Sequence, residues 1–302
     1  MAQPQAVWRM ATEYSRENIS GVGLTEFARL VSQRTDGFLA VEPVYESAVG
    51  SGDLIAAAGT GRIHGGDAFA GPLEALDPVF GLSSLPFVVA STQGAQALNE
   101  RARPAYEAIF ARYGMTLLYV TVWPPTGLWS DRPLHGPEDI RALVIRVYDY
   151  KSAHVMQAAG ATALYLPFRE ALERLRAREL NAILTSGDGG AAQGLWRMLR
   201  QFNGISYAVP VSMAFVRSDM FDALPANVRD DVIACARETE RRQFDLVATR
   251  TAKNYRRMIG NGVAISDPPS GAVISHLRAS ARDVVAAWKD NVPSEIADLV
   301  AS

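Results

Sequence analysis

One uninterrupted helical pattern near the C-terminus most constrains how this 302-residue chain can fold. Pro225 stands at a favoured first-turn position, and nothing breaks the pattern before Gly260-Asn261-Gly262. At about 1.5 Å per residue, a helix of about 35 residues is roughly 50 Å long. Such a helix is too long for one small domain, so we expect helix 225–259 to span two domains.

The rest of the chain alternates between strand-like and helix-like segments, which is typical of an α/β fold with mostly parallel sheets. The sequence changes character at Trp123-Pro124-Pro125, and we interpret this point as a crossover between domains. The predicted domains are two α/β units: residues 1–123 plus about 211–250, and residues 124–210 plus about 251–302.

Composition and motif spacing exclude several classes of function. A net charge of −2 without a basic stripe argues against nucleic acid as a partner. No apolar run reaches the length of about 18 residues that a membrane-spanning helix needs. The four histidines do not stand at HExxH spacing, and no Walker sequence or complete dinucleotide fingerprint occurs. The single Cys235 excludes an internal disulfide and a cysteine-based metal cluster. We therefore expect neither a metal nor a cofactor.

One arginine interrupts an apolar run that is bounded by turn signals. The run Ala142–Val147 is typical of a buried strand, and Arg146 lies inside it. A buried charge without a partner is costly, and the planar fork of arginine suits a carboxylate held by two hydrogen bonds. On residue chemistry alone the partner is either a protein carboxylate, with Asp149 and Glu170 as candidates, or a ligand.

Four segments, in their order and spacing, carry a family resemblance across nearly the whole chain. They are Asp77–Phe87, Arg132–Val147, Leu164–Ala182 and the helix after Pro225. The second segment contains Arg132-Pro133-Leu134, then Pro137-Glu138-Asp139-Ile140 and Ile145-Arg146-Val147. Together they resemble the DctP-like substrate-binding proteins of TRAP transporters (tripartite ATP-independent periplasmic transporters). This resemblance implies a two-domain periplasmic-binding-protein fold with an interdomain ligand cleft and a long spine helix.

Departures from the family pattern bear on the ligand. A second arginine, found in some sialate and dicarboxylate binders, has no counterpart in Thr126–Ser130. Two other patterns are closer to family members that resemble aromatic-acid binders. They are Val122–Pro125 with Trp129, and Thr185–Gly187 with Trp196. The resemblance therefore implies an organic monocarboxylate, with an aromatic or heterocyclic acid favoured.

The resemblance also assigns roles to individual residues. Arg146 becomes the anchor of the ligand carboxylate, and aromatic walls cover the ligand's ring, as is usual for such pockets. Each assignment has an alternative. Trp123 and Trp129 would only fill the domain junction, Phe69 would be a core residue, Glu13 and Tyr14 would form a plain loop, and Thr185 and Ser186 would cap a helix before Asp188. The predicted ligand-binding residues are Arg146, Glu13, Tyr14, Phe69, Trp129, Trp123, Tyr148, Thr185 and Ser186.

The implied function is transport rather than catalysis. The protein would capture a small organic acid in the periplasm, close by a hinge motion and dock on the membrane subunits of a TRAP permease. No charged-then-apolar leader opens the chain, so we expect a mature form without its signal peptide. Two alternatives stay open. One is an enzyme on a similar fold, with Glu13 or Asp188 as base, and the other is a sensor that signals to a receptor.

Overall fold

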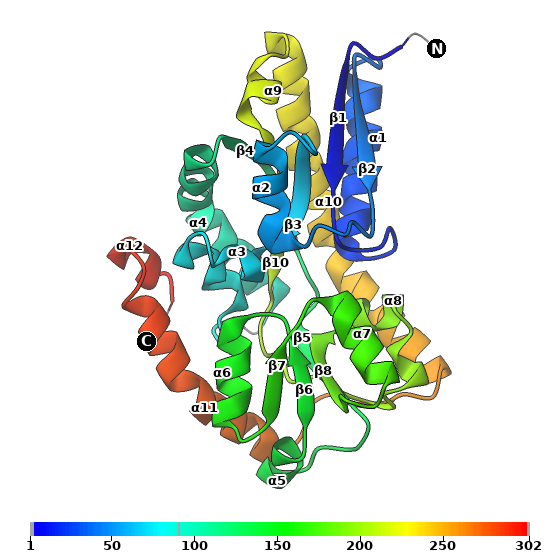
Figure 1. Ribbon diagram of the computed structural model, residues 1–302, viewed down its shortest axis with the longest axis vertical. Coiled ribbons are helices and arrows are strands. Elements are labelled where there is room, and N and C mark those ends of the chain that lie inside the picture. Colours follow the sequence, from blue (N-terminus) through cyan, green and yellow to red (C-terminus); the bar gives the residue numbers. More distant parts are fainter. Residues whose placement is uncertain (1–2, 90, 301–302) are drawn as a thin grey trace. The chain divides into compact units, whose positions relative to one another are not determined.

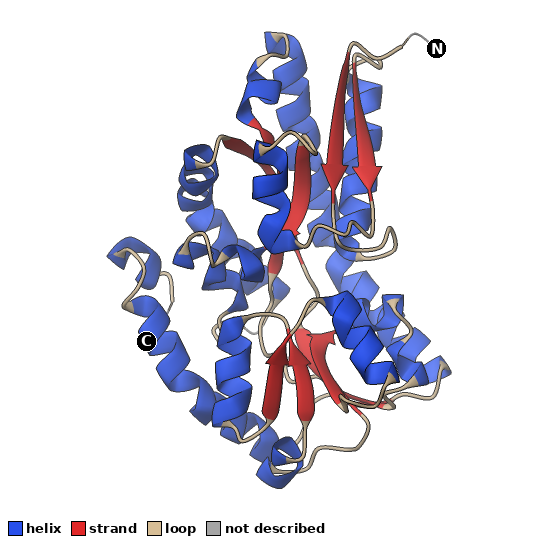
Figure 2. Cartoon of the chain, viewed as in Figure 1, coloured by secondary structure: helices blue, strands red, loops and turns tan. Residues whose placement is uncertain are grey.

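The computed structural model describes residues 3–89 and 91–300 (Figure 1). The chain divides into two compact units. Unit 1 comprises Met1–Phe80, Gln96–Trp123 and Val211–Val247, and unit 2 comprises Gly81–Ala95, Pro124–Pro210 and Ala248–Ser302. The segment Gly81–Ala95, expected in the first domain, groups instead with unit 2. Each unit has its own sheet, drawn in red in Figure 2.

The sheet of unit 1 has five strands in the order β2-β1-β3-β10-β4. β1 pairs in parallel with β2 and β3, whereas β10 runs antiparallel to both β3 and β4. β3 and β4 therefore point the same way, and the carboxyl ends of β1, β3 and β4 share one edge. The strands are β1 (Ala6–Ala11), β2 (Leu39–Val44), β3 (Gly65–Phe69), β4 (Met115–Val122) and β10 (Val211–Arg217).

Helices of unit 1 pack against this sheet through apolar faces. α1 (Ile19–Arg34) buries Leu24, Phe27 and Val31 at a spacing of three and four residues, as expected for one helical face. The core also receives Val228, Val232 and Cys235 of the long helix. The other helical elements are α2 (Leu54–Gly59), α3 (Ala70–Leu73), α4 (Thr92–Arg112), α9 (Ser218–Asp222) and the 3₁₀ turns Ser51–Asp53 and Pro78–Ser84.

The sheet of unit 2 has six strands in the order β11-β9-β5-β8-β6-β7. β6 runs parallel to β7 and β8, and β5 runs antiparallel to β8 and β9. The strands are β5 (Thr126–Ser130), β6 (Val144–Val147), β7 (Thr162–Tyr165), β8 (Ala182–Ser186), β9 (Gln201–Asn203) and β11 (Ala264–Ser266). The helical elements are α5 (Pro137–Arg141), α6 (Tyr150–Ala158), α7 (Phe168–Arg176), α8 (Gly187–Ala192), α11 (Gly271–Lys289), α12 (Ser294–Ala297) and the 3₁₀ turn Leu195–Arg197.

The long helix is α10, which runs for 35 residues from Ala226 to Gly260. The long helix predicted from the sequence is confirmed, and it contributes residues up to Val247 to unit 1 and residues from Ala248 to unit 2. Both sheets are mixed, but in each sheet all strands except one run in the same direction, so the expectation of mostly parallel sheets fails only for β10 and β5. Strand direction depends on partners far away in the chain, which a local pattern does not specify.

Candidate functional site

Arg146 lies on β6, in the interior of the unit 2 sheet. It pairs in register with Leu164 on β7 and Ile183 on β8, so its neighbours on both adjacent strands are aliphatic. Its Nε donates a hydrogen bond to the Leu166 carbonyl at 2.9 Å, and its guanidinium carbon lies 5.1 Å from the centre of the Phe168 ring. β7 and the start of α7 therefore hold the guanidinium in a fixed orientation.

The two protein carboxylates considered as partners for Arg146 have other roles. Asp149 caps α6, where its Oδ1 accepts from the Ser152 amide at 2.7 Å. Glu170 accepts from Arg174 at 2.8 Å, one turn further along α7. The ion pairs that the sequence suggested with these two residues are thus replaced by a helix cap and a bridge within one helix.

Aromatic side chains follow the arginine strand in unit 2. Tyr148 is buried, and its ring centroid lies 6.5 Å from that of Tyr207 in an edge-to-face contact. Phe87 packs on Tyr207 at 5.5 Å, and the Arg278 guanidinium lies over Phe87 at 5.6 Å. Burial raises the pKa of the Tyr148 phenol well above its ordinary value. Sequence reasoning missed Tyr207, because it stands in a loop without a motif.

Two predicted residues of β8 serve the start of α8. The Ser186 hydroxyl accepts from the Gly189 amide at 3.1 Å and caps the helix. A Cβ at Gly189 would lie 2.5 Å from Oγ1 of Thr185, so any larger residue there would require the Thr185 side chain to move. Asp188 accepts from Asn254 at 2.8 Å and pairs with Arg250. These contacts agree with the capping role that the sequence left open for Ser186.

Trp129 lies in the core of unit 2. Its side chain is fully buried, and its ring centroid is 5.3 Å from that of Phe202. Its indole Nε1 donates to the Ser186 carbonyl at 3.3 Å. A Cβ at Gly190 would fall within 2.3 Å of the indole, which shows how closely α8 packs on the ring. Trp129 therefore packs as a core residue of unit 2, a role that the sequence did not suggest.

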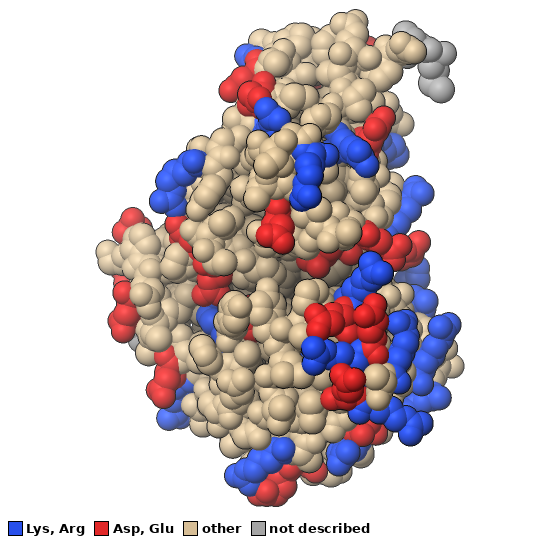
Figure 3. All heavy atoms as spheres, in the orientation of Figure 1, with Lys and Arg blue, Asp and Glu red and all other residues tan. Residues whose placement is uncertain are grey.

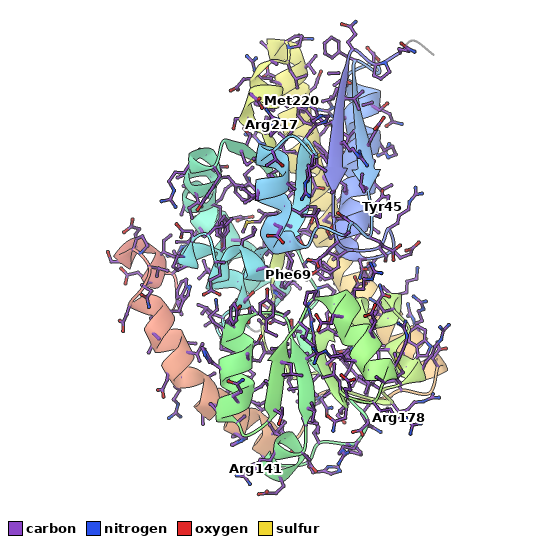
Figure 4. All side chains as sticks on the ribbon, viewed as in Figure 1. Tyr45, Phe69, Arg141, Arg178, Arg217 and Met220 are labelled. Atoms are coloured by element: carbon purple, nitrogen blue, oxygen red, sulfur yellow. The ribbon has the colours of Figure 1, made fainter. Side chains whose placement is uncertain are left out.

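Three predicted aromatic residues come together in unit 1. Ring centroids lie 4.7 Å apart for Tyr14 and Trp123, 6.0 Å for Phe69 and Trp123, and 6.4 Å for Tyr14 and Phe69. Figure 4 labels Phe69 at the end of β3. The three residues follow or end β1, β3 and β4, whose carboxyl ends share one edge, and ligands of open α/β sheets bind at such edges. We call these three residues the aromatic cluster.

Glu13 lies beside the aromatic cluster but is engaged by the protein. Its carboxylate accepts from the hydroxyl of Ser51 and, at 3.2 Å, from the Ser51 amide. The same hydroxyl accepts from the Phe69 amide at 2.8 Å. Glu13 therefore fixes the backbone that carries Phe69, a role that the sequence alone did not indicate.

A buried acid supports the sheet beneath the aromatic cluster. Asp67 on β3 and Tyr119 on β4 flank Ala214 on β10 in one row, and the small alanine leaves room between them. Ser20 donates to Asp67 Oδ1, and the hydroxyls of Ser212 and Tyr119 lie near the same carboxyl group. Burial raises the pKa of Asp67 to about 7, and these neighbouring hydroxyls, Ser20 first, offset part of that rise.

Trp123 is connected to this buried acid. Its indole Nε1 donates to the Ser212 hydroxyl at 2.8 Å. The Ser212 hydroxyl that accepts from Trp123 also lies near Asp67 and lowers the pKa of its carboxyl group. Within residues 3–89 and 91–300, no group of three or more His, Cys, Asp or Glu side chains is arranged to hold a metal ion. None of the helices described there is both long and apolar enough to cross a membrane.

Comparison with known proteins identifies a family. The profile of DctP, bacterial extracellular solute-binding protein family 7, matches residues 10–290. A search of curated protein sequences finds no match.

Solved structures share the fold at low sequence identity. A Bordetella pertussis extracytoplasmic solute receptor described as binding pyroglutamic acid, DctP7, superposes with a TM-score of 0.93 at 22% identity, covering 97% of this chain and 99% of that one. A marine metagenome TRAP solute-binding protein specific for pyroglutamate gives 0.92 at 20%, with 99% of each chain covered. A Sulfitobacter protein with bound β-D-galacturonate gives 0.88 at 16%, covering 97% and 99%. None of these ligands is an aromatic acid.

Proposed function

The chain belongs to the DctP family of bacterial extracellular solute-binding proteins, and from this premise we propose that it captures a small organic monocarboxylate and delivers it to a TRAP membrane permease. The proposed location is the periplasm, where such receptors meet their solutes. The protein would act by binding alone and would leave the solute chemically unchanged.

Arg146 carries the proposal. It is a buried arginine at the carboxyl end of parallel strands, and a backbone carbonyl and an aromatic ring fix its orientation. An oriented guanidinium suits a carboxylate because two parallel hydrogen bonds match the geometry of the two groups. Asp149 caps α6 and Glu170 pairs with Arg174, so neither of these two carboxylates is the proposed anchor's counterpart.

The aromatic cluster is the proposed contact for the rest of the ligand. Flat side chains present apolar area at little cost in conformational entropy, and they suit a ring better than a flexible polar chain. We therefore propose a ring-bearing acid, heterocyclic or aromatic. Pyroglutamate and galacturonate, the ligands of similar structures, each carry one carboxylate on a saturated ring. These two ligands support a monocarboxylate as the solute of this protein but do not support an aromatic ring. Acids with a saturated ring are therefore the first compounds to test.

A thermal-shift screen tests this function. The panel contains pyroglutamate, uronates, aromatic, pyridine and indole acids, keto acids and dicarboxylates, each beside its uncharged amide. A ligand at about 100 times its dissociation constant stabilises the folded protein by about 2.7 kcal/mol, which is a visible shift. We expect shifts from ring monocarboxylates and none from their amides. Equal shifts from acid and amide would contradict the arginine anchor, and conversion of a bound acid to a product would contradict the receptor function.

A further inference from the structure

The C-terminal part of α10 carries charge of one sign only. From Val247 to Gly260 it has four cationic residues and no carboxylate, whereas residues 226–246 have five acidic and four basic residues. Three of the cations, Lys253, Arg256 and Arg257, are exposed and follow the spacing of three and four residues that places side chains on one helical face. This face belongs entirely to unit 2.

Two further exposed arginines extend this face through the neighbouring segment. Arg197 lies in the 3₁₀ turn beside Trp196, and the guanidinium of Arg257 lies 4.9 Å from the centre of the Trp196 ring. Arg200 donates to the carbonyl of Asn261, just beyond the end of α10, at 2.9 Å. We call the five residues Arg197, Arg200, Lys253, Arg256 and Arg257 the cationic surface. Blue side chains gather along this edge of unit 2 in Figure 3.

Acidic side chains do not neutralise the cationic surface. In the part of the chain that the structure describes, none of its five residues forms an ion pair. Asp188 is held by Arg250 and Asn254, and Asp267 accepts from the Tyr255 hydroxyl at 3.0 Å. At 100° per residue, Tyr255 points away from the face that carries Lys253 and Arg256, and Asn254 lies about 100° from Lys253. Arg250 borders the face and takes up Asp188, while the five residues of the cationic surface pair with neither acid.

The helix dipole accounts for only part of this pattern. Cations stabilise a helix near its C-terminus, and the effect fades beyond the last turn. Arg257 lies in the last turn, and Arg200 bonds a terminal carbonyl. Lys253, Arg256 and Arg197 have no such contact. Five like charges on one surface repel one another, so their common placement calls for an anionic partner.

We propose that the cationic surface docks on the anionic headgroups of a phospholipid membrane. The charges are of one sign, without the exposed aromatic residues that mark the centre of protein interfaces, since Trp196 is 9% exposed and lies beneath Arg257. Ile259, 60% exposed, follows the cations on the same helix, and an aliphatic side chain next to cations suits the boundary of headgroups and acyl chains. The surface shares no residue with the proposed solute site, and the inference does not depend on which solute is bound.

The predicted behaviour is weak, salt-sensitive association that keeps the receptor near the membrane. Exposed charges act over a Debye length of about 10 Å at 0.1 M salt, so binding should fall as salt rises. Each cation at an anionic lipid surface contributes about a fivefold change in partitioning. The chain as a whole carries a net charge of −2, so the effect requires the local surface rather than the total charge.

Vesicle co-sedimentation of the full chain tests the proposal. The test variant is Lys253→Gln with Arg256→Gln, and the matched control is Arg237→Gln with Arg241→Gln, two exposed arginines on the same helix within unit 1. At low salt the wild type should pellet with phosphatidylglycerol–phosphatidylcholine vesicles and not with phosphatidylcholine alone. The test variant should bind about 30-fold more weakly, and the control should match the wild type.

Three results would overturn the proposal. The first is that the wild type does not pellet with anionic vesicles. The second is that the control variant loses as much vesicle binding as the test variant. The third is that the wild type is retained by an immobilised polyglutamate column but does not bind vesicles. The third result would assign the surface to an acidic protein. The melting temperature of both variants identifies a variant that is misfolded. Solute binding by both variants tests the proposed receptor function separately from vesicle binding by this surface.

Discussion

The two units gather their candidate residues at equivalent places but with different chemistry. In each sheet the carboxyl ends of parallel strands share an edge. The aromatic cluster lies at this edge in unit 1, and Arg146 is the next-to-last residue of β6 in unit 2. Unit 2 presents a charged group there, Arg146, whereas unit 1 presents the flat aromatic cluster. The same backbone arrangement can thus supply either a specific charge or a broad apolar contact, depending on which side chains follow the strands.

Two tryptophans illustrate the difference. Trp123 and Trp129 stand six positions apart on either side of the unit boundary, and the sequence suggested the same role for both. Trp123 contacts Tyr14 and Phe69 in the aromatic cluster, while Trp129 lies under α8 in the core of unit 2. Proximity in sequence therefore says little about function when a domain boundary lies between two residues.

Trp129→Ala should produce the largest loss of stability. The indole is fully buried, and truncation of a buried tryptophan costs about 3–5 kcal/mol through lost burial and the cavity left behind. Urea unfolding measures the change. A loss below about 1 kcal/mol would show that Trp129 is not a core residue, and Trp123→Leu is the matched control in the other unit.

The Asp67→Asn variant should change how stability depends on pH. The pKa of Asp67 is about 7 in the folded protein and near 3.8 when unfolded, so the folded state binds more protons between these values. The free energy of unfolding contributed by Asp67 therefore falls as pH rises from about 4 to 7, by up to about 4 kcal/mol.

Asparagine keeps the acceptor for Ser20 and cannot ionise. The free energy of unfolding of the variant should therefore not decrease between about pH 4 and 7, and the variant should be more stable than the wild type at pH 8. Denaturant unfolding at a series of pH values measures the difference. Parallel curves for wild type and variant would contradict the raised pKa of Asp67.

Arg146→Ala should weaken binding of the carboxylate at least about 100-fold, because truncation removes a charge-assisted, two-pronged hydrogen bond. Arg146→Lys should fall in between, since lysine keeps the charge and loses the fork. Calorimetry with the acid identified in the screen measures both. Arg174→Ala, which removes a surface arginine paired with Glu170, is the matched control and should bind normally. Normal binding by Arg146→Ala would assign the carboxylate to another residue.

Trp123→Leu should give the smallest effect, about a tenfold loss of affinity for a ring-bearing acid, because aliphatic packing replaces one aromatic contact. The loss should be smaller for an acyclic acid such as lactate. Calorimetry with the two kinds of acid makes the comparison. Equal losses would indicate that Trp123 acts through its bond to Ser212 rather than through contact with the ring.

Several features of this protein follow from the sequence alone. Pro225 and the absence of helix breakers before Gly260 specified α10, and the apolar run around Arg146 specified β6, because these patterns arise from local geometry. The order of short motifs pointed to the DctP family, to which the chain belongs. These signals are local or depend only on order along the chain, so they can be read without coordinates.

Only the tertiary structure decided the rest. The antiparallel placement of β5 and β10, the burial of Trp129 and the hydrogen bonds that engage Glu13 and Ser186 all involve partners distant in sequence or backbone groups without a motif. Asp67 attracted no attention in the sequence, because a single aspartate in a short strand has no pattern. Its raised pKa arises from burial between neighbouring strands, and burial is a property of the assembled fold.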